Sequence, residues 1–244
     1  MTRSTFRVAD YAAGKLPPVC IAHRGFSGRY PENTRVAFEK AVEIGAHMVE
    51  FDIRWSADRH LVVFHDADLA RIAGRNVAVQ ELTLKELQQV DVGVGQRILR
   101  FEQVLDEFAG RIGMNLHVQA TGELVDRVVE RCRQADLLDQ VFLAITWAEE
   151  IQRVRAAYPD VWVCSLYEQG SPQMVEKNAE LDVKLLQPSL YVITEDFVQQ
   201  AKSAGMVSGV FYANTFSTFR WFKQLGIEGI LTDHPDVFFD VMGR

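Results

Sequence analysis

Three short segments of the sequence end in side chains that could do chemistry. Each places two polar residues at or near the end of an apolar run, and such a run predicts a strand buried on both faces. The pairs are His23 and Arg24 after residues 19–22, Glu50 and Asp52 within residues 49–53, and His65 and Asp66 after residues 61–64. Charged groups in these positions need partners, a metal or a ligand. Their closeness along the chain predicts a single site.

The chemistry of that site follows from the residue types. Glu50 and Asp52 are separated by one residue, so both side chains project from the same face of a strand. Two carboxylates on one face repel each other unless a cation or a shared proton neutralises them, and oxygen ligands suit Mg²⁺, Ca²⁺ or Mn²⁺. His23 and His65 on either side are typical of general acid and general base catalysis. Arg24 could bind a pair of phosphate or carboxylate oxygens.

Eight apolar runs could form the strands that position these side chains. They occupy residues 19–23, 47–53, 114–119, 141–145, 161–166, 184–188, 208–213 and 229–233. Strand–helix alternation predicts a parallel α/β fold, and eight repeats favour a (β/α)8 TIM barrel over an open sheet. No Gly-x-Gly-x-x-Gly turn opens a helix, which disfavours a dinucleotide-binding fold. We therefore expect one barrel domain over residues 19–244, preceded by a loosely attached lead-in over residues 1–18.

Amphipathic segments of helical length separate the apolar runs. Examples are residues 32–45, 121–134, 194–205 and 215–226, with Thr34, Thr121, Thr194 and Thr215 as candidate N-caps or first-turn residues. Residues 54–100 are too long for a simple connection, so a small insertion is predicted after the second strand. Residues 61–66 should extend that strand or form a short strand beside it, followed by helices over 82–90 and 100–110. Insertions at this face of a barrel are where substrate-binding loops lie.

Composition excludes several classes of protein. The chain has 244 residues, 48% of them hydrophobic and 24% charged, with a formal net charge of -7. An acidic chain is a poor candidate for general nucleic-acid binding, which depends on Lys and Arg. Cys20, Cys132 and Cys164 lack metal-ligand spacing and are expected to be buried, reduced thiols. No apolar run is long enough to span a membrane and no signal peptide is recognisable, so a cytoplasmic location is expected.

Four motifs carry a resemblance to a known family. They are His23-Arg24-Gly25, residues 31–34 (PENT), Glu50-Phe51-Asp52 and His65-Asp66, and together they resemble the glycerophosphodiester phosphodiesterase family. Asn214 resembles the seventh-strand Asn of that family, and residues 229–235 resemble its closing strand and turn. The resemblance covers residues 19 to 240 or so. It implies a barrel enzyme of lipid and glycerol metabolism that hydrolyses a small phosphodiester with one divalent metal ion.

The resemblance also assigns roles to residues. It implies that His23 and His65 are the acid/base pair, although His65 could instead attack phosphorus. Arg24 would hold a phosphate oxygen, and Glu50 and Asp52 would bind the metal. Three further residues would hold the catalytic groups in place without reacting themselves: Glu32, Asn33 and Asn214. For Asp233-His234-Pro235 we favour a helix-capping turn.

The third predicted strand departs from the family pattern, which there is Glu, one residue, then Lys. This chain has His117 at the metal-ligand position and Gln119 at the phosphate-binding position. The two changes remove one negative and one positive charge, so the formal charge is unchanged if His117 is neutral. An imidazole ligand favours a softer ion such as Mn²⁺ or Zn²⁺ over Ca²⁺. A second departure is Phe211-Tyr212, which replaces the usual Trp-Thr.

These departures keep several functions open. The first is hydrolysis of a glycerophosphodiester to glycerol phosphate and an alcohol. The alternatives are a phosphodiesterase tuned to a sugar phosphodiester, a non-catalytic phosphate-ligand binder, and a lyase resembling the sphingomyelinases that forms a cyclic phosphate. The expected partner is a small-molecule phosphodiester. A homo-oligomer face could form from Trp221, Phe222, Phe238 and Phe239, although an apolar stripe packed on the barrel explains these four residues better.

Overall fold

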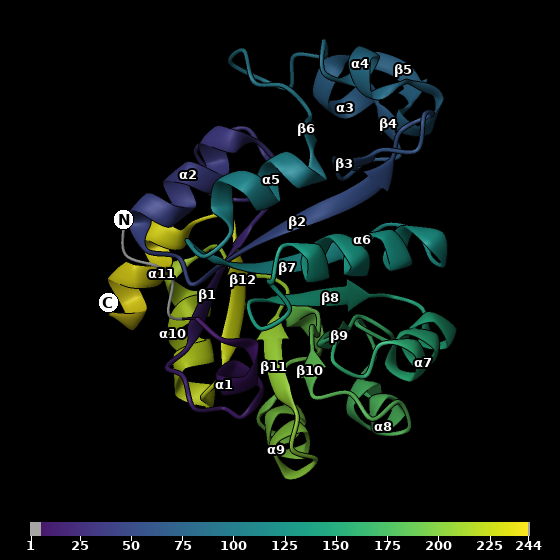
Figure 1. Cartoon of the computed structure of the whole chain (residues 1–244). Coiled ribbons are helices and arrows are strands. Elements are labelled where there is room, and N and C mark those ends of the chain that lie inside the picture. The colour runs from purple at the N-terminus through teal and green to yellow at the C-terminus, as the bar shows by residue number, and fades with distance from the viewer. Residues whose placement is uncertain (1–5, 244) are drawn as a thin grey trace.

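Eight parallel strands close into a barrel in the computed structural model, which describes residues 6–243. The strands in spatial order are β1 (Val19–His23), β2 (Met48–Trp55), β7 (Gly113–Val118), β8 (Val141–Ile145), β9 (Val163–Ser165), β10 (Leu185–Leu186), β11 (Val207–Val210) and β12 (Gly229–Thr232). Each pairs in parallel with the next, and β12 pairs with β1. The predicted (β/α)8 barrel is confirmed, and each strand lies within two or three residues of its predicted position (Figure 1).

Helices cover the outside of the barrel (Figure 1). They are α2 (Arg35–Ile44), α5 (Phe101–Phe108), α6 (Glu123–Gln134), α7 (Ala148–Ala157), α8 (Met174–Ala179), α9 (Glu195–Ser203), α10 (Phe216–Leu225) and α11 (Pro235–Met242), with a 3-10 turn η2 (Leu190–Val192) after β10. Their apolar faces and the outward side chains of the strands form one continuous core. Phe222 and Phe238 belong to that core, as expected for an apolar stripe, whereas Trp221 beside them is 38% exposed.

Side-chain caps fix where three of these helices begin. Thr34, Thr194 and Thr215 accept hydrogen bonds from backbone N–H groups three residues on, at the starts of α2, α9 and α10. The expectation for Thr121 is wrong, because Gly122 occupies the N-cap position of α6 without a side-chain cap. The N–H of Gly122 instead donates to Glu150 Oε1 at 2.9 Å, so a neighbouring helix satisfies it.

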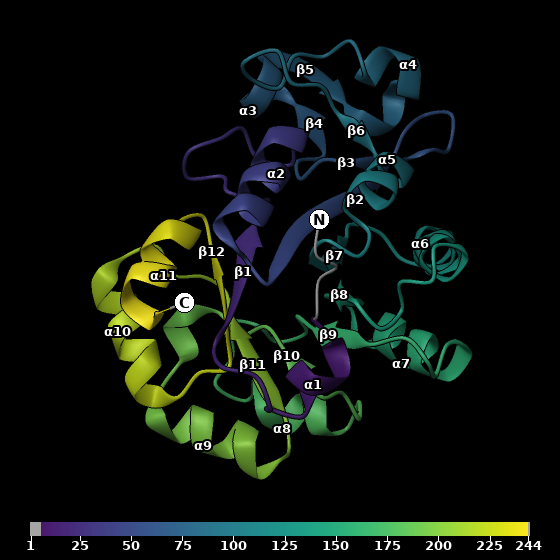
Figure 2. The ribbon, with the colours of Figure 1, turned by 60° about the vertical axis from the view of Figure 1, so that its left-hand side comes forward.

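Residues 6–12 close the amino-terminal end of the barrel. Phe6, Val8 and Tyr11 are buried against the first residues of several strands, and α1 (Val8–Ala12) lies across this end (Figure 2). Tyr11 comes so close to Gly229 that a Cβ there would lie 2.1 Å from the Tyr11 hydroxyl oxygen. The expectation of a loosely attached lead-in is therefore wrong for this segment. Its apolar side chains fill a barrel end that would otherwise expose the strand core to water.

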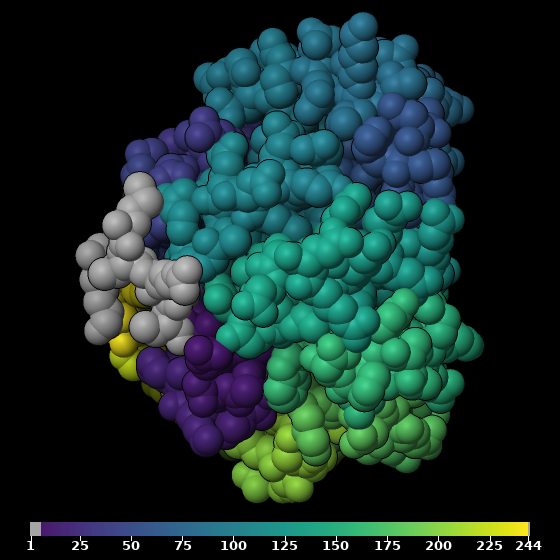
Figure 3. Space-filling view, viewed as in Figure 1, coloured from purple at the N-terminus to yellow at the C-terminus, as the bar shows by residue number. Residues whose placement is uncertain are grey.

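The predicted insertion follows β2 and has its own small core. β3 (Leu61–Val63) pairs antiparallel with the end of β2, and β6 (Leu99–Arg100) pairs antiparallel with β3. Between them lie β4 (Asp68–Leu69), α3 (Ala70–Ala73), β5 (Arg75–Ala78), a 3-10 turn η1 (Val79–Glu81) and α4 (Leu84–Leu87). Buried side chains such as Phe64, Leu69 and Leu87 hold it together. It projects from the carboxyl end of β2 and forms the top of the molecule (Figures 1 and 3).

No helix among the described residues is both long enough and apolar enough to cross a membrane. The three cysteines are free and buried, as the sequence predicts.

Candidate active site

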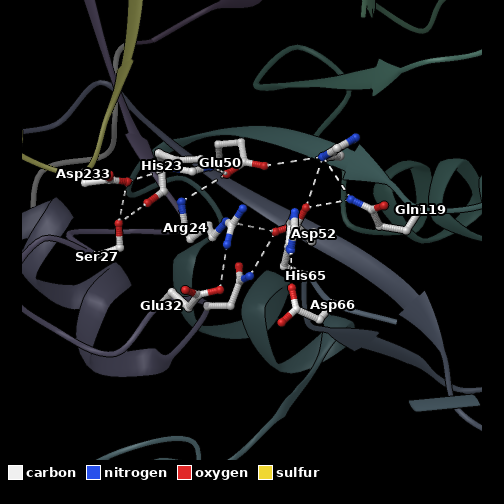
Figure 4. Close-up of polar contacts among 12 residues, drawn as sticks. His23, Arg24, Ser27, Glu32, Glu50, Asp52, His65, Asp66, Gln119 and Asp233 are labelled. Atoms are coloured by element: carbon white, nitrogen blue, oxygen red, sulfur yellow. Dashed lines mark hydrogen bonds and ion pairs between the residues drawn. The ribbon is translucent and has the colours of Figure 1, made fainter. Parts of the chain in front are cut away.

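Strand register brings the predicted site residues together at the carboxyl ends of three neighbouring strands. His23 of β1 lies beside Glu50 of β2, and Asp52 of β2 lies beside His117 of β7. Side chains alternate along a strand, so Glu50 and Asp52 both point into the barrel. Figure 4 shows the resulting cluster, with His23 at one side and Gln119 at the other.

The turn after β1 points Arg24 into the site. Arg24 adopts φ 55°, in the left-handed region that non-glycine residues rarely occupy. In this conformation its backbone N–H donates to Glu50 Oε2 at 3.0 Å, and its guanidinium donates to Glu32 Oε1 at 2.8 Å. Gly25 follows at φ 81°, where a Cβ would lie 2.7 Å from the Cβ of Ala37. The glycine therefore allows the turn to pack against α2.

Two carboxylates are buried side by side in the cluster. Glu50 is 3% exposed and Asp52 is 0% exposed. Burial and the negative charge of Asp52 together raise the pKa of Glu50 well above its usual value. Burial also acts to raise the pKa of Asp52, but the hydrogen bond from His117 and nearby positive charges lower it overall. A cation bound beside both groups would favour their ionised forms.

The donor atoms of this cluster fit a divalent metal. Glu50, Asp52 and His117 each offer one ligand atom, and these atoms lie within 4.8 Å of one another. His117 Nδ1 is 3.1 Å from Asp52 Oδ1 and 4.0 Å from Glu50 Oε1. Two carboxylate oxygens and one imidazole nitrogen suit Mn²⁺ or Zn²⁺ as well as Mg²⁺. The cluster is therefore a candidate metal site.

His23 is oriented by a carboxylate that the sequence interpretation missed. Its Nδ1 lies 2.7 Å from Asp233 Oδ1, which also accepts from the Ser27 hydroxyl at 2.9 Å. Asn214 Nδ2 donates to Asp233 Oδ2 at 2.6 Å. Burial acts to raise the pKa of Asp233, but these hydrogen bonds lower it to about 2. The other ring nitrogen of His23, Nε2, is 3.9 Å from Glu50 Oε2 and so faces the candidate metal site.

The interpretation of Asp233-His234-Pro235 as a capping turn is only half right. His234 is the N-cap residue of α11 and Pro235 its first residue, but no side chain caps the helix. Asp233 instead binds His23, because β12 and β1 are neighbours once the barrel closes. The position of Asp233 at the end of the last predicted strand was the available clue.

His65 is oriented in a similar way from the insertion. Its Nδ1 lies 2.6 Å from Asp66 Oδ1, and Asp66 accepts from Arg71 Nε at 2.6 Å. Arg71 also donates to both carboxylate oxygens of Glu32, at 2.8 and 2.7 Å. Because Glu32 in turn accepts from Arg24, one arginine of the insertion connects His65 with Arg24. The sequence interpretation did not identify Arg71.

Gln119 on the third strand contacts the candidate metal ligands. Its Nε2 donates to Asp52 Oδ1 at 2.8 Å and lies 3.1 Å from His117 Nδ1. Its Oε1 accepts from Arg54 Nη2 at 3.4 Å. Asn33 donates to the other oxygen of Asp52 at 3.0 Å, so both oxygens of that carboxylate are held.

These residues surround a cavity of about 60 Å³. Its wall includes six of the predicted site residues: His23, Arg24, Glu50, Asp52, His65 and His117. The rings of Phe211 and Tyr212 pack on His23, with centroids 5.4 and 5.6 Å from its own. The buried Nε of Arg24 has no hydrogen-bond partner within residues 6–243, which leaves a donor for a bound oxygen.

A closed barrel with histidines, an arginine and carboxylates at the carboxyl ends of its strands is the arrangement of a TIM-barrel enzyme. A profile of the glycerophosphoryl diester phosphodiesterase family matches residues 23–237. The chain belongs to this family and is therefore a phosphoric diester hydrolase.

Two curated relatives match over nearly their whole length. A glycerophosphodiester phosphodiesterase of Caldanaerobacter subterraneus is 24% identical over 241 residues, covering 94% of this chain and 99% of that protein. One of Bacillus altitudinis is 26% identical over 233 residues, covering 88% and 94%. A solved phosphodiesterase of Oleispira antarctica, in complex with its product sn-glycerol-3-phosphate, has a TM-score of 0.84 at 24% identity, covering 95% and 99%. That likeness shows the shared fold.

Proposed function

We propose that this chain hydrolyses a glycerophosphodiester to glycerol phosphate and an alcohol with one divalent metal ion. The observation that carries the proposal is the convergence of Glu50, Asp52 and His117 beside Arg24 and two oriented histidines. Family membership and the product held by the Oleispira antarctica protein support the same reaction.

Glu50, Asp52 and His117 would hold the metal. When bound, a divalent ion would polarise the phosphoryl group and offset the negative charge that develops in the transition state. Asn33 and Gln119 each donate to Asp52 and would fix the direction of its carboxylate. Such outer hydrogen bonds commonly orient metal ligands.

Arg24 would hold the phosphate. Its guanidinium is anchored by Glu32 at 2.8 Å, and its backbone is anchored by Glu50 at 3.0 Å. Its Nε makes no hydrogen bond and lies 3.7 Å from Asp52 Oδ2, so this N–H is a donor available to a phosphate oxygen. A bond from a guanidinium to a phosphate oxygen is charge-assisted and is stronger than a neutral hydrogen bond.

His23 and His65 would move the protons. Asp233 and Asp66 each bind the Nδ1 side of one histidine, which leaves Nε2 of each ring for the substrate. One histidine would take a proton from the attacking water while the other gives a proton to the leaving alcohol oxygen. The P–O bond to the alcohol breaks as the bond to the water oxygen forms. Which histidine takes which role follows from the side on which the alcohol binds.

The test is hydrolysis by the chelated protein after Mg²⁺, Mn²⁺, Ca²⁺ or Zn²⁺ is added back. We expect release of alcohol and glycerol phosphate, followed by ³¹P NMR, with at least one of these ions. Arg24→Ala and Glu50→Gln should both abolish turnover, whereas Glu176→Gln, an exposed change of the same kind on α8, should leave it intact. Absence of turnover with every ion, across glycerol and sugar diesters, would overturn the proposal.

A further inference from the structure

Two larger cavities accompany the central one of about 60 Å³, and one of them shares lining residues with it. A cavity of about 310 Å³ shares His23, Arg24 and Phe211 with it. Another, of about 280 Å³, lies between the barrel rim and the insertion and is lined by Arg54 and Gln119, among others. We call this one the Arg54 cavity. A bound water occupies roughly 10–15 Å³ by the same measure, so the central cavity suits a phosphoryl group and the outer two suit its ester arms.

The Arg54 cavity and the central cavity have no lining residue in common, but hydrogen bonds join residues of the two walls. Gln119 donates to Asp52 Oδ1 at 2.8 Å, and Arg54 Nε donates to the backbone oxygen of His65 at 2.7 Å. Asp52 and His65 both line the central cavity. An arm that leaves the phosphoryl group on the His65 side would therefore meet Arg54 and Gln119. Ala67 and Gln80 on the wall of this cavity are exposed, so an alcohol could leave without passing Arg24.

The Arg54 cavity has positive charge and unused hydrogen-bond donors. Arg54 is its only charged lining residue, and no carboxylate within residues 6–243 forms an ion pair with that guanidinium. A guanidinium has five N–H donors, and two of these are used, on His65 and Gln119. The amides of Gln80 and Gln119 add neutral polar groups. Hydroxyl groups can pair with all three side chains.

The same wall is unsuited to a cationic alcohol. Quaternary ammonium groups are recognised by open aromatic faces or by carboxylates. Trp55 is the only aromatic residue that lines this cavity, and the Arg59 guanidinium already lies over its ring at 4.1 Å from the centroid. No carboxylate lines the cavity either. A choline or ethanolamine group placed here would face Arg54 without a compensating partner.

We infer that the Arg54 cavity receives the leaving alcohol and selects uncharged, hydroxyl-rich alcohols over those that carry an ammonium group. The inference rests on the proposed hydrolysis of glycerophosphodiesters and adds the class of alcohol. Arg54 acts as the specificity-determining residue. The apolar side of the cavity, formed by Val79 and Leu124 among others, packs against the carbon skeleton of the alcohol.

The experiment compares kcat/KM for four diesters of glycerol phosphate, in which the alcohol is glycerol, inositol, choline or ethanolamine. We expect the protein to prefer the first two by about tenfold or more, because the charge of Arg54 is the only one on the wall of this cavity. Arg54→Gln should raise the relative rate on the choline diester, and Arg54→Lys should keep the original preference. Arg75→Gln removes an exposed arginine of the same insertion and should change nothing.

A second variant tests the inference even if Arg54→Gln fails to fold. Gln80→Glu places a carboxylate on the exposed wall of the cavity and should also shift preference towards choline. Equal kcat/KM of the unaltered protein on all four diesters would overturn the inference. So would a change in kcat/KM that is the same for all four diesters in both Arg54→Gln and Gln80→Glu. Either result would leave the proposed hydrolysis standing. Failure of the unaltered protein on every diester with every metal would instead overturn the proposed function.

Discussion

Arg71 of the insertion binds Glu32 through two hydrogen bonds, 2.8 Å from Nη1 and 2.7 Å from Nη2. The same guanidinium binds Asp66 at 2.6 and 3.1 Å. Glu32 anchors the proposed phosphate-binding Arg24, and Asp66 orients the proposed acid/base residue His65. Through this one side chain, the insertion thus supports both the proposed phosphate-binding Arg24 and the proposed acid/base residue His65.

We expect Arg71→Ala to lower kcat/KM by about tenfold or more, because outer-layer partners of catalytic groups commonly have effects of this size. The side chain of Arg71 is 48% exposed, so the free energy of unfolding should fall by only about 1 kcal/mol or less. Steady-state kinetics and thermal unfolding measure the two effects. Arg75→Gln is the control on the same insertion. Unchanged kinetics in Arg71→Ala would show that the contacts to Glu32 and Asp66 do not position the site.

Asp233 should contribute stability that depends on pH in a defined window. Its pKa is lowered from 3.8 to about 2, so its contribution is present above pH 4 and is lost as the pH falls towards 2. The shift corresponds to about 2 kcal/mol. Asp233→Asn should therefore be less stable at pH 7, with a difference from the unaltered protein that shrinks between pH 4 and 2.

Urea unfolding at pH 7, 4 and 3 measures this difference. Asp240→Asn, an exposed change on α11, the helix that follows Asp233, is the control and should show a negligible difference at each pH. A difference for Asp233→Asn that stays constant from pH 7 to pH 3 would contradict the role of its ionised carboxylate.

His117 and Gln119, at the carboxyl end of β7, should determine which metal ion the site prefers. We expect the double change His117→Glu with Gln119→Lys to shift the most effective ion from Mn²⁺ or Zn²⁺ towards Mg²⁺ or Ca²⁺, because a carboxylate is a harder ligand than imidazole. The measurement is kcat/KM with each ion for both proteins. Activity that exists only in the double variant would mean that the unaltered chain binds a phosphate ligand without turnover.

Metal binding should also stabilise the fold without any substrate present. An ion at one hundred times its Kd that binds only the folded protein adds about 2.7 kcal/mol. We expect Mn²⁺ to raise the Tm of the chelated protein, and we expect Glu50→Gln to lose most of that rise. Glu176→Gln should keep it. An equal rise in Tm for all three proteins would mean that the ion binds outside the Glu50 cluster.

The barrel and the centre of the site were predictable because they follow local patterns. Alternation within β2 alone puts Glu50 and Asp52 on one face, and strand–helix alternation places that face at a barrel end. Phe6, Val8 and Tyr11 were harder, because only the closed barrel creates the surface that buries them. The sequence pattern of a short helix does not indicate what it packs against.

The functional residues that the sequence analysis missed either contact a partner far away in the chain or lie in or next to the insertion. Asp233 binds His23 across 210 positions, a contact that exists only because β12 meets β1. Arg71 lies on a four-residue helix of the insertion, and Arg54 lies where β2 extends beyond the barrel to pair with β3. None of these positions has a periodic pattern that points to its partner, so the sequence interpretation did not reach these contacts.

An anomalous difference map from crystals soaked in Mn²⁺, recorded at the manganese edge, tests the metal site most directly. We expect one peak bound by carboxylate oxygens of Glu50 and Asp52 and by a ring nitrogen of His117, and we expect Glu50→Gln crystals to lack it. A protein that hydrolyses the diester while its crystals show no peak at these residues, or show it elsewhere, would contradict the assignment of Glu50, Asp52 and His117 as metal ligands.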